Sequence, residues 1–271
     1  MINRLGSPIC VILLALAVFS SATADDELPL CKTGAQGQMG ARMHDGAHMT
    51  MTALRAMSPD DAVRATEILR TMRESLAKYQ DYRVAFADGY EIYMPDAPQQ
   101  VYHFANRSLT IAEYEGDYNL AHPGSLLYEK KFFGGWKLVG AMYSASPRAT
   151  PAQLDELIPL GVARWHAHTN ICLPQGVTER DVINGDLKNG AQLAAAARLE
   201  RAGEDGGPRS GDRQRLGWMA DPRFGFEGTI SDASTCEAIG GNFHKQIFGW
   251  MVHVYPFASD DLRVAFSTNA P

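Results

Sequence analysis

Two histidines one residue apart, His166 and His168, are the strongest chemical signal in the chain. They lie in an apolar stretch over 164–172 whose composition predicts a strand. Because side chains alternate between the two faces of a strand, both imidazoles are expected to point to the same side. Neutral imidazole is the commonest metal ligand in proteins, so the pair is a candidate for part of a metal site.

A metal site would need further donors from other segments. His103 and His253 each lie within a predicted strand among apolar neighbours, and Glu129 follows the apolar run 126–128. A glutamate buried in such a run needs a partner, which a metal ion or a histidine would supply. Three histidines, or two histidines and a glutamate, with an open position form the usual catalytic zinc or iron site. The candidate ligands of a divalent ion (zinc, copper or iron) are therefore His103, Glu129, His166, His168 and His253.

The segments that must position these residues predict one mixed α+β domain over 58–271. Ser58-Pro59-Asp60-Asp61 combines a capping serine, a proline at the first helical position and an acidic first turn, so a helix is expected to about Tyr79. Gly134-Gly135 predicts a tight hairpin between two strands. The overall expectation is N-terminal helices packed beside a largely antiparallel β-sheet or open barrel. The predicted strands cover 101–104, 125–132, 136–144, 162–168, 224–230 and 247–257.

The first residues have the pattern of a secretory signal peptide over 1–24. Arg4 precedes an apolar run over 8–19, and Ala22-Thr23-Ala24 matches a cleavage site of the A-x-A type. The run is shorter than the roughly 20 apolar residues that span a bilayer, so cleavage near Ala24 is favoured over a stable membrane anchor. We therefore expect a secreted or periplasmic protein.

Three cysteines remain after such a cleavage: Cys31, Cys172 and Cys236. An exported protein meets oxidising conditions, so one disulfide is expected. We favour a Cys172–Cys236 bond with Cys31 left free. In the alternative, Cys172 is a metal ligand beside the histidine pair, and spacing alone does not separate the two.

Residues 25–57 are predicted to form a flexible tail that contains methionine and histidine. Thioether and imidazole groups together suit copper. Methionine in such a tail also serves simply as a flexible apolar group that packs onto a domain. An Ala-rich helix over 187–201 and a Gly-rich surface loop over 203–215 are expected further along the chain. The tail residues concerned are Met39, Met43, His44, His48, Met49 and Met51.

Composition and the lack of common motifs remove support from several classes of function. The net charge is −6 and no basic stripe is visible, so nucleic acid is a poor candidate partner. The sequence contains no G-x-G-x-x-G, no P-loop, no G-x-S-x-G and no H-E-x-x-H. Dinucleotide binding, phosphate-loop chemistry, serine hydrolysis by the common elbow and zincin proteolysis therefore lose support. A small molecule or a metal ion remains as the expected partner.

The chain contains the short blocks Ala87-Asp88-Gly89-Tyr90, Tyr102-His103-Phe104-Ala105-Asn106, Leu126-Leu127-Tyr128-Glu129 and Trp165-His166-Ala167-His168. These blocks resemble a group of uncharacterised secreted bacterial proteins, over roughly 78–174. The order of a Val-Gly-x-x-Tyr strand and then Trp-His-x-His is also similar to the plant oil-body-associated protein family. The resemblance implies a shared fold and a secreted setting, and it transfers no reaction. Its blocks contain candidate ligands, among them His103, Glu129 and His166.

Three functions stay open on these grounds. The first is an exported metal-dependent protein with His103, His166 and His168 as ligands, in which enzymatic turnover is undecided. The second is the handling of copper or another metal through the segment 25–57, without turnover. The third is a binding module whose sheet holds an apolar small molecule, in which the histidines are ordinary hydrogen-bonded residues. Of these, the first is our working hypothesis.

Overall fold

The computed structural model describes residues 43, 45–97, 99–186 and 217–271. All of them belong to Gly34–Pro271, the second of the two units into which the contacts divide the chain. The first unit, Met1–Thr33, lies outside the described residues, and so do the predicted signal peptide and Cys31. The predicted helix over 187–201 and the predicted loop over 203–215 lie outside them as well.

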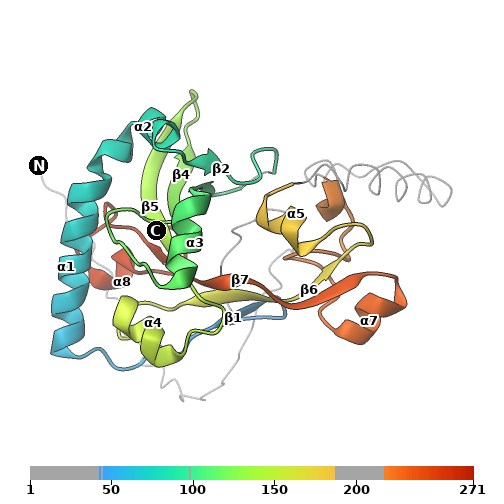
Figure 1. Cartoon of the computed structure of the whole chain (residues 1–271). Helices are drawn as coiled ribbons and strands as arrows, with labels where there is room; N and C mark the ends of the chain where they lie inside the picture. The colour runs from blue at the N-terminus through green and yellow to red at the C-terminus, as the bar shows by residue number, and fades with distance from the viewer. Residues whose placement is uncertain (1–42, 44, 98, 187–216) are drawn as a thin grey trace, which may run out of the picture. The chain divides into compact units, whose positions relative to one another are not determined.

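One antiparallel sheet organises the described residues (Figure 1). Its strand order is β1-β6-β7-β5-β4-β3-β2, and each neighbouring pair is antiparallel. Because β1 and β2 are edge strands, the sheet is open and not a closed barrel. The strands are β1 (Met49–Met51), β2 (Glu91–Ile92), β3 (Tyr102–Ala105), β4 (Ser125–Lys130), β5 (Trp136–Ala145), β6 (His166–Leu173) and β7 (Asn242–Val254).

The first helix, α1 (Pro59–Leu76), begins where the sequence predicts. The Ser58 hydroxyl accepts a hydrogen bond from the Asp61 amide at 3.1 Å, and the Asp61 carboxylate accepts one from the Ser58 amide at 2.7 Å. The buried side chains of α1 join those of the sheet in the main core, which confirms the α+β class. In the described part of the chain, no helix is long and apolar enough to cross a membrane. The other helices are α2 (Tyr82–Ala87), α3 (Arg107–Glu115), α4 (Pro151–Leu157), α5 (Glu179–Ile183), α7 (Ala233–Ala238) and α8 (Leu262–Ala265), with 3-10 turns at Ala77–Gln80 and Gly217–Ala220.

Alternation along the strands gives the sheet two distinct faces. Phe104 of β3, Tyr128 of β4 and Val252 of β7 are buried in the main core with α1. Neighbouring residues of a strand point to opposite faces. His103 directly precedes Phe104, and His253 directly follows Val252. Both histidines therefore lie on the face away from α1.

The strands β6 and β7 run on from the sheet as a paired ribbon toward α5 and α7 (Figure 1). The disulfide predicted from the sequence is present there: Cys172 of β6 bonds to Cys236 of α7, with a Cα–Cα distance of 5.7 Å. Cys172 is therefore not a free thiolate that could bind a metal. A second apolar cluster along the ribbon contains Ile171, Leu173, Val177, Val182, Trp218 and Ile247.

Residues 224–230 form turns, so the strand predicted there is wrong. Gly225 adopts a φ of +90°, a conformation that interrupts an extended strand. Phe224 and Ile230 bury against the disulfide. The apolar residues that suggested a strand are thus explained by packing around a covalent link.

Candidate functional site

Four imidazoles from three strands meet on the face of the sheet away from α1. The ring centroids of His103 and His253 are 5.5 Å apart, those of His166 and His253 are 5.1 Å apart, and those of His166 and His168 are 5.9 Å apart. The Nε2 atoms of His103 and His253 lie within 3.5 Å of each other. The structure therefore brings together four of the five candidate ligands, which we call the histidine cluster.

Curvature of the sheet makes this meeting feasible. β3 and β7 are separated by β4 and β5, so their backbones are three strand spacings apart. In a flat sheet that is roughly 14 Å, at about 4.8 Å per strand. Imidazole atoms at 3.5 Å therefore require this face to be concave. Register shifts between Leu127 and Tyr128 and between His166 and His168 mark two irregularities that bend strands in this way.

Burial keeps the rings of the histidine cluster neutral. His166 and His253 are buried, and His103 and His168 are partly buried. Loss of hydration lowers the pKa of His103 and of His168 to about 4 and that of His253 to about 3. Burial also holds the pKa of His166 well below its ordinary value, and the neighbouring imidazoles add to the effect. At neutral pH each ring thus has a free lone pair, which is the form that binds metal ions.

Hydrogen bonding within the protein leaves the cluster incompletely satisfied. Among the described residues, the buried Nδ1 atoms of His103, His166 and His168 have no hydrogen-bond partner. Only His253 has one at this atom, since the Tyr255 hydroxyl lies 3.3 Å from its Nδ1. If that hydroxyl donates to Nδ1, the Nε2–H of His253 can donate to Nε2 of His103. The proton of His103 then sits on its buried Nδ1 without an acceptor. Buried polar atoms of this kind are rare and call for an explanation.

The spacing of one imidazole pair matches a shared ion. With metal–nitrogen bonds of about 2.0–2.1 Å and tetrahedral angles, two ligating nitrogens lie about 3.3–3.4 Å apart. The Nε2 atoms of His103 and His253 are 3.5 Å apart. Within residues 43, 45–97, 99–186 and 217–271, however, no group of three or more His, Cys, Asp or Glu side chains is arranged so that it could hold a metal ion. The rings of His166 and His168 would have to turn to join the pair.

Glu129, the fifth candidate ligand, has a charged partner outside the histidine cluster. Its carboxylate accepts a hydrogen bond from Nζ of Lys137 at 3.4 Å, and the side chain is 38% exposed. Lys137 lies directly opposite on β5, so the two charges form a cross-strand pair. The glutamate therefore has a charged partner and some contact with water, two features that the sequence argument did not include.

The segment 45–51, within the predicted flexible tail over 25–57, is held against the sheet. β1 pairs with β6, and the His48 ring reinforces this contact. Its Nδ1 lies 2.9 Å from the carbonyl oxygen of Asn170, and its Nε2 lies 2.7 Å from that of Gly228. Both ring nitrogens thus face backbone acceptors. His48 therefore joins three segments and is not available as a metal ligand.

Methionine side chains flank the histidine cluster, and among them the sequence alone indicated only Met51. His166 pairs with Met51 on β1 and with Met251 on β7, and His253 pairs with Met142 on β5. Directly opposite residues of antiparallel strands point to the same face. Three thioether groups therefore lie on the cluster's side of the sheet. The strand register shows that Met51, Met142 and Met251 share this side, although they are far apart in the chain.

Aromatic rings close the cluster on the side of His168. The ring centroid of Phe226 lies 4.7 Å from that of His168, and the ring centroid of Phe248 lies 6.3 Å from it. Phe248 has a φ of +68°, which is unusual for a bulky residue and costs local strain. The cluster therefore lies beside a partly buried apolar wall.

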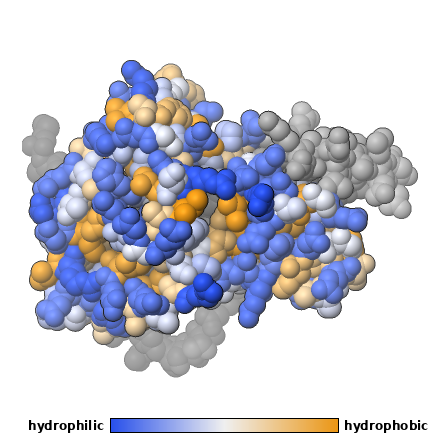
Figure 2. Space-filling view, viewed as in Figure 1, coloured by the Kyte–Doolittle hydropathy of each residue, from blue (hydrophilic) through white to orange (hydrophobic). Residues whose placement is uncertain are grey.

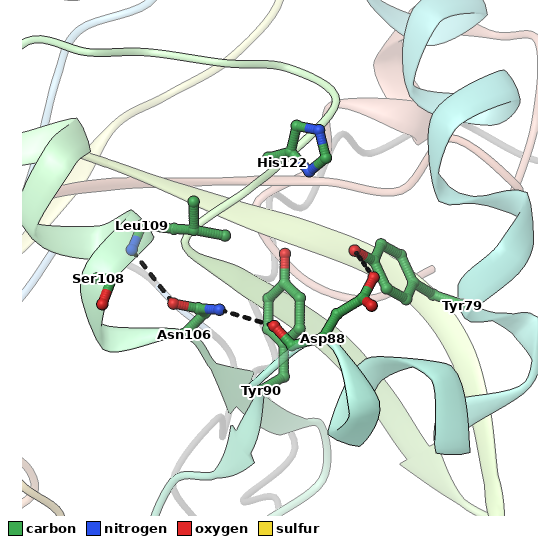
Figure 3. A pocket seen from close by; sticks show the side chains of 7 residues that line it. All are labelled: Tyr79, Asp88, Tyr90, Asn106, Ser108, Leu109 and His122. Carbon is green, nitrogen blue, oxygen red and sulfur yellow. Dashed lines mark hydrogen bonds between the residues drawn. The ribbon is translucent and has the colours of Figure 1, made fainter.

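A separate pocket of about 460 Å³ lies beside α2 and α3 (Figure 3). Its polar groups bond mainly to one another. The Tyr79 hydroxyl donates to the Asp88 carboxylate at 3.0 Å, and Nδ2 of Asn106 donates to the Asp88 carbonyl oxygen at 3.1 Å. These bonds join neighbouring elements, so the pocket offers fewer unsatisfied groups than the histidine cluster. It is lined by Tyr79, Asp88, Tyr90, Asn106, Ser108, Leu109 and His122.

The histidine cluster is thus the strongest candidate for a functional site in the described part of the chain. It combines neutral imidazoles, unpartnered ring nitrogens and flanking thioethers on a concave surface. Comparison of the chain with protein-family models, with curated proteins and with solved structures found no match.

Proposed function

We propose that this chain is an exported metal-binding protein whose ion is held by His103 and His253 with help from His166 and His168. The observation that carries the proposal is the Nε2–Nε2 distance of 3.5 Å between His103 and His253, within a cluster of four buried or partly buried rings.

Energetics support a ligand for this cluster. An unpartnered polar atom in the interior costs on the order of 1–3 kcal/mol, so a protein gains little from gathering several of them without a purpose. The low pKa values give rings that need not lose a proton before they bind an ion. Rotation of His166 and His168 about their side-chain bonds would supply the third and fourth donors.

The decisive experiment measures metal content and affinity in protein without a histidine tag. We expect elemental analysis to find a transition metal, and calorimetry on chelator-treated protein to show binding of Zn²⁺ or Cu²⁺. His103→Ala should weaken that binding about tenfold or more, because the cluster loses one of its paired donors. His122→Ala is the matched control, since His122 lines the separate pocket. Absence of bound metal together with no binding on addition would refute the proposal, as would equal affinities of the two variants.

A second candidate, copper handling without turnover, is favoured by the methionine side chains beside the rings. Thioether ligands select Cu(I) among the common ions, whereas zinc is bound well by imidazole alone. We expect Met251→Leu, which nearly conserves volume, to reduce Cu(I) affinity and to leave Zn²⁺ affinity unchanged. Equal Cu(I) affinity of the variant and the parent protein would exclude this second candidate.

A further inference from the structure

The hairpin between β4 and β5 ends in two almost fully exposed phenylalanines. Phe132 is 94% exposed and Phe133 is 97% exposed, the highest fractions among the large apolar side chains that the structure describes. They are the central residues of a turn that the Gly134 amide closes by donating to the Lys131 carbonyl at 3.1 Å. They therefore occupy the outermost positions of the hairpin tip, Lys130–Lys137.

The turn itself does not require these side chains. Central turn positions are usually filled by Gly, Pro, Asn, Asp or Ser. Gly134 and Gly135, with φ values of +90° and +78°, take up the unusual backbone conformation. The two phenyl rings pack edge-to-face on each other, with centroids 5.0 Å apart. Because the two side chains contribute nothing to the core, the folding of the chain does not explain why they are exposed.

Basic side chains surround the aromatic pair. Lys130 and Lys131 are exposed, and neither forms an ion pair with any described residue. Lys137, on the opposite strand, is 63% exposed and pairs with Glu129. Apolar and hydrophilic side chains lie together over α2 and the hairpin at the top of the view in Figure 2. The tip is therefore locally basic in a chain whose net charge is −6.

We propose that the hairpin tip docks reversibly on an anionic lipid bilayer surface. Phe132 and Phe133 would enter the boundary between headgroups and acyl chains, and Lys130 and Lys131 would meet the lipid phosphates. Aromatic residues combined with lysine are typical of surfaces that bind lipid interfaces. Protein–protein interfaces, by contrast, are depleted of lysine, so charge and composition favour a lipid partner over a protein groove. The inference is independent of the histidine cluster.

Co-sedimentation of the full chain with vesicles tests the inference. We expect binding to vesicles of equimolar phosphatidylcholine and phosphatidylglycerol, and weaker binding to phosphatidylcholine alone. The double variant Phe132→Ser, Phe133→Ser should bind the mixed vesicles about tenfold less tightly or worse. The double variant Lys130→Gln, Lys131→Gln should lose the preference for the anionic vesicles. The apolar run over 8–19 is present in all these proteins, so the differences report on the tip alone.

Val63→Ser is the matched control, because Val63 is an exposed apolar residue of α1, 69% accessible and remote from the hairpin in sequence. It should bind vesicles like the parent protein. A Phe132→Trp variant should show a blue shift of its emission with the mixed vesicles, as expected for an indole that leaves water. Failure of the full chain to bind either vesicle, or equal binding by the serine double variant, would overturn the inference. Self-association that depends on the two phenylalanines, in a protein that does not bind vesicles, would also overturn the inference. The tip would then bind a second copy of the chain.

Discussion

At the scale of single residues, the histidine cluster makes stability depend on pH. The folded state lowers the pKa of His103 and His168 to about 4 and that of His253 to about 3, whereas an unfolded chain has histidine pKa values near 6.5. Between those values the unfolded state binds more protons than the folded state. Stability is therefore complete above about pH 6.5 and falls as the pH drops toward the folded pKa values.

We expect metal-free protein to lose about 2 kcal/mol of unfolding free energy for each of His103, His168 and His253 between about pH 7 and pH 5. Urea denaturation in the presence of a chelator measures this loss. His253→Gln should reduce this loss of unfolding free energy by the contribution of one histidine, because glutamine does not titrate. His122→Gln, outside the cluster, provides the comparison. An identical slope for His253→Gln and the parent protein would contradict the assignment of His253 as a buried neutral ring.

The sequence indicated the four histidines that the structure brings together because two signals were local. These were the spacing of His166 and His168, and the apolar neighbours of His103 and His253. Glu129 could not be judged in the same way, since the residue that neutralises it lies across a strand pair. The sequence did not indicate Met142 and Met251 for the same reason, and it did not show that Met51 lies beside the histidines. Residue type suggests a donor, but register decides which donors share a face.

At the scale of elements, the disulfide is the main constraint on the β6–β7 ribbon. Cys172 and Cys236 are separated by 64 residues, and they lie buried with Phe224 and Ile230 in a small apolar cluster. The backbone amide of Gly225 also donates to the Cys172 carbonyl at 3.0 Å. The covalent bond therefore fixes the turns over 221–230, which carry Phe226 against His168.

Replacement of both disulfide cysteines by serine should destabilise the protein by about 2–4 kcal/mol, because the unfolded chain gains conformational freedom. The loss should concentrate in the ribbon. We expect amide exchange to accelerate most in α7 and in the turns over 221–230, and little in α1. Thermal unfolding of the parent protein with and without reductant gives the total effect. An unchanged melting temperature in reductant, with the bond shown to be broken, would speak against this constraint.

Local signals predicted some elements well and failed where distant contacts decide. The start of α1 at Ser58-Pro59 and the hairpin at Gly134-Gly135 depend on residues within one turn of each other, and both are present. The turns over 224–230 depend on a disulfide partner in α7, so the apolar pattern was misleading there. β1 depends on the open edge of β6, which no local pattern shows.

At the scale of the whole described structure, the α+β class followed from the sequence but the strand order did not. The pairing of β5 with β7, far apart in the chain, is a non-local event. Gly140 of β5 marks one of the points where the backbones of these strands approach closely. A Cβ atom at Gly140 would lie 2.3 Å from the Val254 carbonyl oxygen and 2.9 Å from Cδ1 of Tyr255. Tyr255 in turn hydrogen-bonds His253, so the glycine links the close approach to the histidine cluster.

Gly140→Ala should therefore push the end of β7 away from β5 and shift His253 relative to His103. We expect a loss of about 1–3 kcal/mol in unfolding free energy from overpacking and, if the cluster binds an ion, a further fall in metal affinity of about tenfold. Gly116→Ala separates the two effects, because Gly116 has a φ of +96° and open space around its Cβ position. That control should cost about 1 kcal/mol through backbone strain and leave metal affinity unchanged. If Gly140→Ala lowered stability but bound metal as tightly as Gly116→Ala, the close approach of β5 and β7 at Gly140 would not be what holds the imidazoles together.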